Sequence, residues 1–299
     1  NSDKPYDLFL SEQIAGDELA NYQDADEFTE EHFDRLVATG FLRMVEDGTN
    51  ANITNFVPDR QDNIDNEMRV LGSSVFGLTL HCAKCHSHKF DPLSQAGYFR
   101  LRAIFKGAFD EHDWLNPAKR RLPFGHPEEL KRWRENKAAV DAELAAIKAN
   151  EGLDEKAKKK ALEAAEKKRI EQPMVRALWD RGQPSPTYLF NRGDYLQPRE
   201  LIEPGLPRAL VSPGETFRPK PPWQGSGKTG RRLAFVKWLT KGDHPLTARG
   251  MVNRLWKHHF GRRRVILVSR EKDLATHSCS IGWQRNSSRP NGASSGCTD

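Results

Sequence analysis

Long apolar runs are absent from this sequence of 299 residues. Hydrophobic residues make up 37% of the chain, the mean hydropathy is −0.75, and no segment approaches the roughly 20 apolar residues that span a bilayer. These values exclude a membrane-spanning helix. At roughly 100–200 residues per domain, the length predicts about two domains.

A strong excess of charge of one sign is also lacking. The net charge is +6, which on its own would suggest a nucleic-acid or anionic partner. Residues 261–299 hold seven Lys/Arg and three Asp/Glu, so this tail supplies four of the six charges. The rest of the chain is nearly neutral, as a solvated globular surface is. We therefore expect no nucleic-acid partner.

Cysteine is scarce, which excludes a small disulfide-stapled scaffold. Of the four cysteines, Cys82 and Cys85 form a close pair, whereas Cys279 and Cys297 lie in the tail. The close pair indicates a cofactor, a metal or redox chemistry. The chain opens without the pattern of a signal peptide, so we expect either a cytosolic protein or a sequence whose beginning is missing.

Apolar residues at helical spacing recur along most of the chain and predict a mainly α fold. Two helical domains are expected, joined through a helical-hairpin insertion and a Pro/Gly-rich, partly extended linker. Stripes of core residues are predicted within 7–45, a polar stretch within 46–66, and two amphipathic helices over 231–241 and 246–260, the second ending at Gly261. The expected divisions are a cytochrome-type domain at 1–126, a hairpin arm at 127–173, a partner domain at 174–262 and a tail at 263–299.

The residues that indicate chemistry are Cys82, Cys85 and His86, which form a Cys-x-x-Cys-His motif. Two thiols at this spacing form thioethers to haem while the histidine ligates the iron. This predicts haem c, with His86 as the iron ligand. The sixth ligand stays open, and the candidates at the sequence level are Met44, Met68, Met174, Met251 and His112.

The motif has two other interpretations. Zinc could take Cys82, Cys85, His86 and His88 as ligands, although structural zinc sites usually draw a second ligand pair from a distant segment. A redox dithiol would need a βαβ context that the sequence lacks.

A second apparent motif, Gly225-Ser226-Gly227-Lys228-Thr229, resembles a phosphate-binding loop. Pro222 stands where the loop needs its first glycine, and no hydrophobic strand precedes it. We expect no nucleotide.

Several segments resemble one known family. Residues 73–105, SSVFGLTLHCAKCHSHKFDPLSQAGYFRLRAIF, are similar to a cytochrome-type domain of unknown function found in large planctomycete proteins, and so are residues 3–19 and 38–43. Residues 192–207 and 230–262 resemble the partner domain that follows it in that family. The resemblance implies attachment of haem through Cys82, Cys85 and His86, export from the cytoplasm, and a redox partner protein or a fused cytochrome c domain.

The tail departs from that family. The residues from Ser278 to Ser287 can be encoded so that the shifted reading frame spells LLDWLATEF, which matches the helix with which the family continues. We therefore expect a frameshifted, disordered tail from about residue 278, in a chain that is a fragment of a longer protein.

Two functions follow from these patterns. The first is an exported, periplasmic c-type haem protein or redox module that transfers electrons within a larger system. The alternative is a non-haem structural or interaction module, with or without bound zinc, in a carbohydrate- or surface-related assembly. The sequence leaves open whether the chain is an enzyme.

Overall fold

The protein is described by a computed structural model that covers residues 3–261 except residues 24, 26, 51, 92, 151, 153, 212, 213 and 245. Within this part the fold is mainly helical, with two small antiparallel sheets of two strands each. The α-helices are α1 (Tyr6–Leu19), α2 (Glu30–Ala38), α3 (Val57–Leu71), α4 (Gln95–Phe105), α5 (Pro127–Ala149), α6 (Glu155–Glu166), α7 (Arg231–Leu239) and α8 (Thr247–Phe260). The strands are β1 (Arg121–Leu122), β2 (Val175–Arg176), β3 (Tyr188–Asn191) and β4 (Asp194–Leu201). The expected mainly α class is confirmed.

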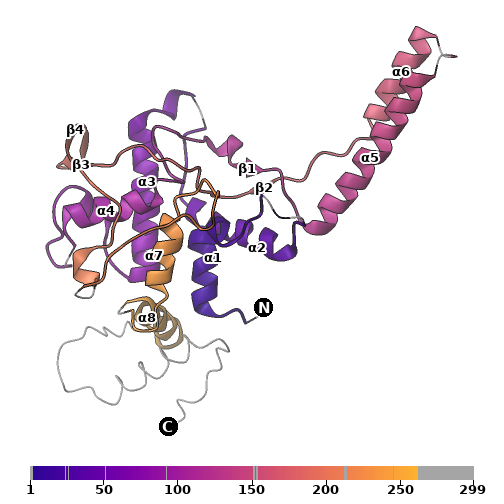
Figure 1. Cartoon of the computed structure of the whole chain (residues 1–299). Coiled ribbons are helices and arrows are strands. Elements are labelled where there is room, and N and C mark those ends of the chain that lie inside the picture. Colours follow the sequence, from indigo (N-terminus) through magenta and orange to yellow (C-terminus); the bar gives the residue numbers. More distant parts are fainter. Residues whose placement is uncertain are drawn as a thin grey trace.

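The main core lies between α1, α3, α4 and α7, which gather in one body in Figure 1. Helix α4 contributes an almost wholly buried run, and α7 adds four more buried apolar side chains. Aromatic rings join these helices edge to face, with Phe235 of α7 5.6 Å from Phe105 and 6.0 Å from Phe76. Segments more than 100 residues apart in the sequence therefore share a single core.

Charged side chains are buried where α1 meets α7. Arg232 and Asp17 are both fully buried, and a guanidinium nitrogen of Arg232 lies 2.8 Å from the Asp17 carboxylate. The neighbouring Glu18 lies farther from Arg232, at 3.4 Å, and accepts a hydrogen bond from the backbone N–H of Leu233. Lys228 donates to the backbone carbonyl of Asp17. These bonds fix α7 and the loop before it onto α1.

A helical arm projects from the body (Figure 1). Helices α5 and α6 pack against each other in antiparallel fashion, and only Leu130, Val140 and Ala165 are buried in them. The arm begins just after β1 and returns just before β2, and these two strands pair with each other. A second, small cluster of buried side chains closes its base, consisting of Tyr22, Phe28, Leu36, Leu122, Leu130, Val175 and Ala177. The predicted hairpin insertion is therefore present, and the chain leaves and re-enters the body at the paired strands β1 and β2.

Strands β3 and β4 form a hairpin on the other side of the body (Figure 1). Its two central turn residues, Arg192 and Gly193, both have positive φ angles of 53° and 79°, as a tight type I′ turn requires. Leu189 and Phe190 of β3 are buried, and the Phe190 ring packs edge to face on Phe99 of α4 at 5.2 Å. The root of the hairpin is thus held in the main core.

The structure differs from the sequence-based expectations in local detail. The segment predicted only as a polar stretch, 46–66, holds most of α3, which begins at Val57 with a proline in its first turn. Leu8, Phe9 and Val37 belong to the apolar stripes that predicted core residues within 7–45, but they are exposed. The tail at 263–299, with Cys279 and Cys297, lies outside the described residues. The predicted end of α8 is confirmed, because Gly261 caps it with a φ of 68°.

Candidate functional site

The Cys-x-x-Cys-His motif lies between α3 and α4. Helix α3 runs on into a π-helical turn (Gly72–Phe76), and a 3₁₀ helix (His81–Lys84) then carries the first cysteine. A 3₁₀ helix has three residues per turn, so residues i and i+3 lie one above the other. Cys82 and Cys85 have this spacing, and both are exposed as free thiols. Cys85 is the residue that ends the 3₁₀ helix, so the local fold exposes both thiols to solvent within one short turn.

The loop after the motif is held by its own hydrogen bonds. The backbone N–H of His88 donates to Leu93 O at 2.8 Å, and the backbone N–H of Asp91 donates to His88 Nδ1 at 2.7 Å. The Asp91 carboxylate accepts from the backbone N–H of Thr79 at 3.3 Å. This extension of the motif, His-Lys-Phe-Asp, therefore closes the loop back onto the segment before the 3₁₀ helix.

The two histidines of the motif carry their protons on opposite nitrogens. His86 Nδ1 lies 2.9 Å from Ser87 O, and a carbonyl only accepts, so Nδ1 donates and Nε2 keeps its lone pair. His88 Nδ1 accepts a backbone N–H, so in the neutral ring the proton sits on Nε2. Histidines that bind metals usually donate their other ring N–H to a carbonyl or carboxylate. His86 is therefore prepared to act as a ligand through Nε2, and His88 is fixed as a structural acceptor.

Buried charges lie directly beneath the motif. Lys84, the second variable residue of the motif, reaches the buried carboxylate of Asp65 on α3 at 2.6 Å. The hydroxyl of Tyr98 on α4 donates to the same carboxylate at 2.5 Å, and Arg102 lies 3.9 Å from it. Asp65 thus ties the motif to both flanking helices.

The pKa values of this cluster follow from burial and from the two carboxylates. Burial disfavours the charge on Lys84, but Asp65 outweighs this effect and the pKa of Lys84 is raised. The pKa of Arg102 is likewise raised. Its complete burial disfavours the charged form, but the negative charges of Asp65 and Glu111 outweigh this effect. Burial, followed by the charge of Asp65, holds the pKa of Tyr98 well above its usual value. The lysine and the arginine are therefore cationic and the tyrosine is neutral.

Two segments of the chain match known protein families. Residues 1–109 match the family PSCyt2, described as a protein of unknown function (DUF1549), and residues 231–277 match PSD1, described as a protein of unknown function (DUF1553). The chain carries a PSCyt2 domain followed by a PSD1 domain. The family expected from the motif and its partner domain are thereby confirmed. No curated protein and no solved structure matches the chain.

The PSCyt2 domain contains the whole motif and also Asp65 and Tyr98. The arm and the β3–β4 hairpin lie between the two matched segments, and α7 and α8 lie in PSD1. Since the α1–α7 contact joins the two matched segments, PSCyt2 and PSD1 share the core described above. Lys228, which the sequence placed in a phosphate-loop-like motif, is buried at this contact over the rings of Tyr22 and Trp223.

The four residues of the zinc alternative do not form a ligand cluster. In the described part of the chain, no three His, Cys, Asp or Glu side chains come close enough together to hold a metal ion. The candidates for a sixth iron ligand differ in burial. Met68 lies in the core, whereas Met44, Met174 and His112 are exposed. None of the helices described is long and apolar enough to cross a membrane.

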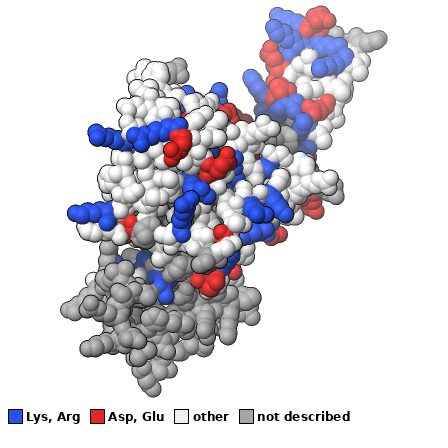
Figure 2. Space-filling model, turned by 60° about the vertical axis from the view of Figure 1, so that its left-hand side comes forward, with Lys and Arg blue, Asp and Glu red and all other residues white. Residues whose placement is uncertain are grey.

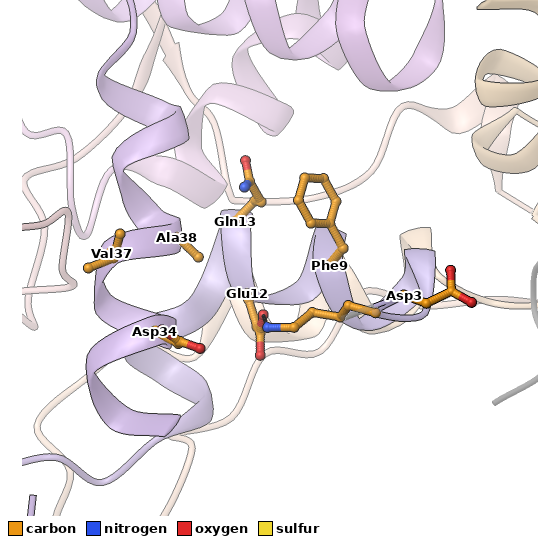
Figure 3. A pocket seen from close by; sticks show the side chains of 8 residues that line it. Asp3, Phe9, Glu12, Gln13, Asp34, Val37 and Ala38 are labelled. Carbon is orange, nitrogen blue, oxygen red and sulfur yellow. Dashed lines mark hydrogen bonds and ion pairs between the residues drawn. The ribbon is translucent and has the colours of Figure 1, made fainter. Parts of the chain in front are cut away.

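A hollow between α1 and α2 lies away from the motif (Figure 3). Its volume is about 610 Å³, and it is open to solvent. The side chains of Phe9, Glu12 and Gln13 line it from α1, and those of Asp34, Val37 and Ala38 line it from α2. The motif therefore lies on an open surface and not in this hollow.

Residues that hold the motif in place were missed at the sequence level. Asp65 lies in the unpredicted α3, for which the spacing of Ile64, Met68 and Leu71 gave a usable signal. Gln95 donates from its side-chain amide to Lys84 O, and Gly193 approaches Cys85 from the hairpin. For these two the sequence held no signal, because both contacts depend on tertiary packing.

Proposed function

We propose that the PSCyt2 part of this chain is a c-type haem module, with haem attached through Cys82 and Cys85 and iron ligated by Nε2 of His86. The single observation that carries the proposal is the donor set of one short turn. Two free, exposed thiols lie three residues apart at this turn, and the adjacent imidazole donates Nδ1–H to Ser87 O. These residues fit the chemistry that covalent haem attachment requires.

Bound haem supplies a one-electron couple, so the proposed activity is electron transfer. The chain's own residues have simpler tasks. Ser87 O holds the His86 ring in one tautomer, and Lys84 and Asp65 hold the turn on α3. The exposure of both cysteines leaves the edge of the site open to a redox partner protein or to a fused cytochrome c domain. Because covalent haem attachment takes place outside the cytoplasm, the proposal includes export to the periplasm.

Expression with a c-type haem maturation system tests the proposal. We expect a Soret band, a pyridine haemochrome spectrum and haem that stays on the chain in a denaturing gel. The double variant C82A/C85A should lose the covalent haem, and H86A should alter the iron spectrum while the thioethers form.

His81 provides the matched control, because it is an exposed histidine at the other end of the same turn. H81A should keep both the covalent haem and the unaltered spectrum. Colourless wild-type protein that contains one zinc per chain would contradict the haem proposal.

A further inference from the structure

The tip of the β3–β4 hairpin touches the motif. A Cβ atom added at Gly193 would lie 2.8 Å from Cys85 Sγ and 3.2 Å from Lys84 Cγ. The first distance is too short for any side chain to be accommodated without movement. The φ angle of Gly193, 79°, also favours glycine. Because glycine has no side chain, this position leaves room for the Cys85 sulfur.

A side-chain amide bridges the same two segments. Gln95, at the start of α4, donates from Nε2 to Lys84 O at 2.9 Å and to Phe190 O at 2.9 Å. A primary amide has two N–H donors, and here one goes to the motif and the other to the hairpin. The bridge joins residues that are 11 and 95 positions away from Gln95 in the sequence.

The hairpin cannot adjust freely to the motif, because its root is packed in the core. Phe190 is 6% exposed, its ring lies 5.2 Å from that of Phe99, and the Arg102 guanidinium lies 5.9 Å from the ring centre. The core therefore sets where the turn at Gly193 stands, and the exposed turn of the motif meets it there.

We propose that the β3–β4 hairpin, although it lies outside the residues that match PSCyt2 and PSD1, forms one wall of the motif's site, and that Gly193 and Gln95 are positioning residues that set the approach to Cys85. The proposal deepens the function proposed above, since attachment at Cys85 takes place against this wall. It also stands without haem, because the contacts involve only atoms of the chain.

Thiol reactivity in the full chain without haem tests it. Reduced protein is treated with iodoacetamide, and peptide mass spectrometry gives the alkylation rates of Cys85 and Cys82, with Cys82 as the internal reference. In G193A the added methyl group and the fixed hairpin force the turn of the motif outward, so we expect the Cys85/Cys82 rate ratio to rise several-fold. Q95M keeps the length of the side chain and removes the bridge, and it should raise the ratio in the same direction.

Gly225 is the matched control for G193A. Its φ angle is 80°, and a Cβ added there would meet nothing within 4 Å. G225A therefore carries the same backbone strain without the contact, and its ratio should equal that of the wild type. An unchanged or lower ratio in both G193A and Q95M overturns the proposal. A raised ratio in a chain that never attaches haem would leave the wall in place and contradict only the haem function.

Discussion

Asp65 is a single buried carboxylate that faces several donors beneath the motif. Lys84 lies 2.6 Å from it, Arg102 lies 3.9 Å from it, and the Tyr98 hydroxyl donates to it. Removing one partner of a buried ion pair is costly because the other charge is left without compensation. The position of the motif therefore depends on a residue that carries out no chemistry itself.

The substitution D65N should lower the free energy of unfolding by about 3 kcal/mol, because it leaves Lys84 and the buried Arg102 without their shared carboxylate. Urea unfolding followed by circular dichroism measures this loss. D62N is the matched control, since Asp62 lies 3.5 Å from the same lysine but is 73% exposed. It should cost less than about 1 kcal/mol, and equal losses in the two variants would contradict the role of Asp65.

At the scale of elements, the arm of α5 and α6 is the part least connected to the fold. Its long-range contacts are mainly those between its own helices, including exposed ion pairs from Lys168 to Glu143 at 2.7 Å and from Arg169 to Asp141 at 2.8 Å. Such exposed pairs contribute little to stability. On the face in Figure 2, basic and acidic side chains are interspersed along the arm, and neither sign forms a continuous patch.

Shortening the arm should leave the body intact. Asn136 donates to Lys168 O at 3.1 Å and accepts from the backbone N–H of Ile170 at 3.0 Å, so the two chains are adjacent there. Replacing residues 137–167 with a short glycine-containing loop keeps this contact and the packing of Leu130. We expect the midpoint of thermal unfolding to shift by only a few degrees and the Cys85/Cys82 alkylation ratio to stay at the wild-type value. Loss of cooperative unfolding would mean that the arm supports the core.

The spacing of apolar residues predicted the helices that have a regular apolar stripe. It did not predict which residues are buried where burial depends on packing against a distant segment. The helices α7 and α8, the hairpin arm and the end of α8 at Gly261 follow directly from spacing and glycine placement. Leu8, Phe9 and Val37 fit a stripe but are exposed, since α1 and α2 are covered on other faces. The motif was found because its chemistry is local. Asp65 was missed together with helix α3, whose apolar spacing was not used, whereas Gly193 was missed because a contact across the fold leaves no spacing to detect.

At the scale of the whole molecule, the α1–α7 contact unites the two matched domains through groups that titrate. Burial raises the pKa of Glu18 to about 8, and the Arg232 charge only partly opposes this shift. Arg232 lies closer to Asp17, at 2.8 Å, than to Glu18, at 3.4 Å. Glu18 is therefore mostly protonated at pH 7, and Arg232 pairs with the Asp17 carboxylate.

This protonation makes the stability of the molecule depend on pH. In the folded protein the pKa of Glu18 lies above its ordinary value of 4.5. The contribution of Glu18 to the free energy of unfolding is therefore fully present below about pH 4.5 and is lost as the pH rises through 8. E18Q keeps an acceptor for Leu233 and does not ionise. Relative to wild type, E18Q should gain about 2 kcal/mol of stability or more between pH 5 and pH 9, measured by urea unfolding at both values. E31Q, at an exposed glutamate of α2, should show no such gain, and a pH-independent difference for E18Q would contradict a raised pKa.

The hairpin that forms the wall beside Cys85 is synthesised after the motif. The chain is synthesised from its N-terminus at about 5–20 residues per second, and Gly193 follows Cys85 by about 110 residues. For roughly 5–20 s the ribosome has therefore completed both thiols of the motif but not the turn that will stand against one of them. A partner that binds the nascent or translocating chain in that interval finds Cys82 and Cys85 equally accessible. The two thiols differ in accessibility only after the hairpin has folded against Cys85.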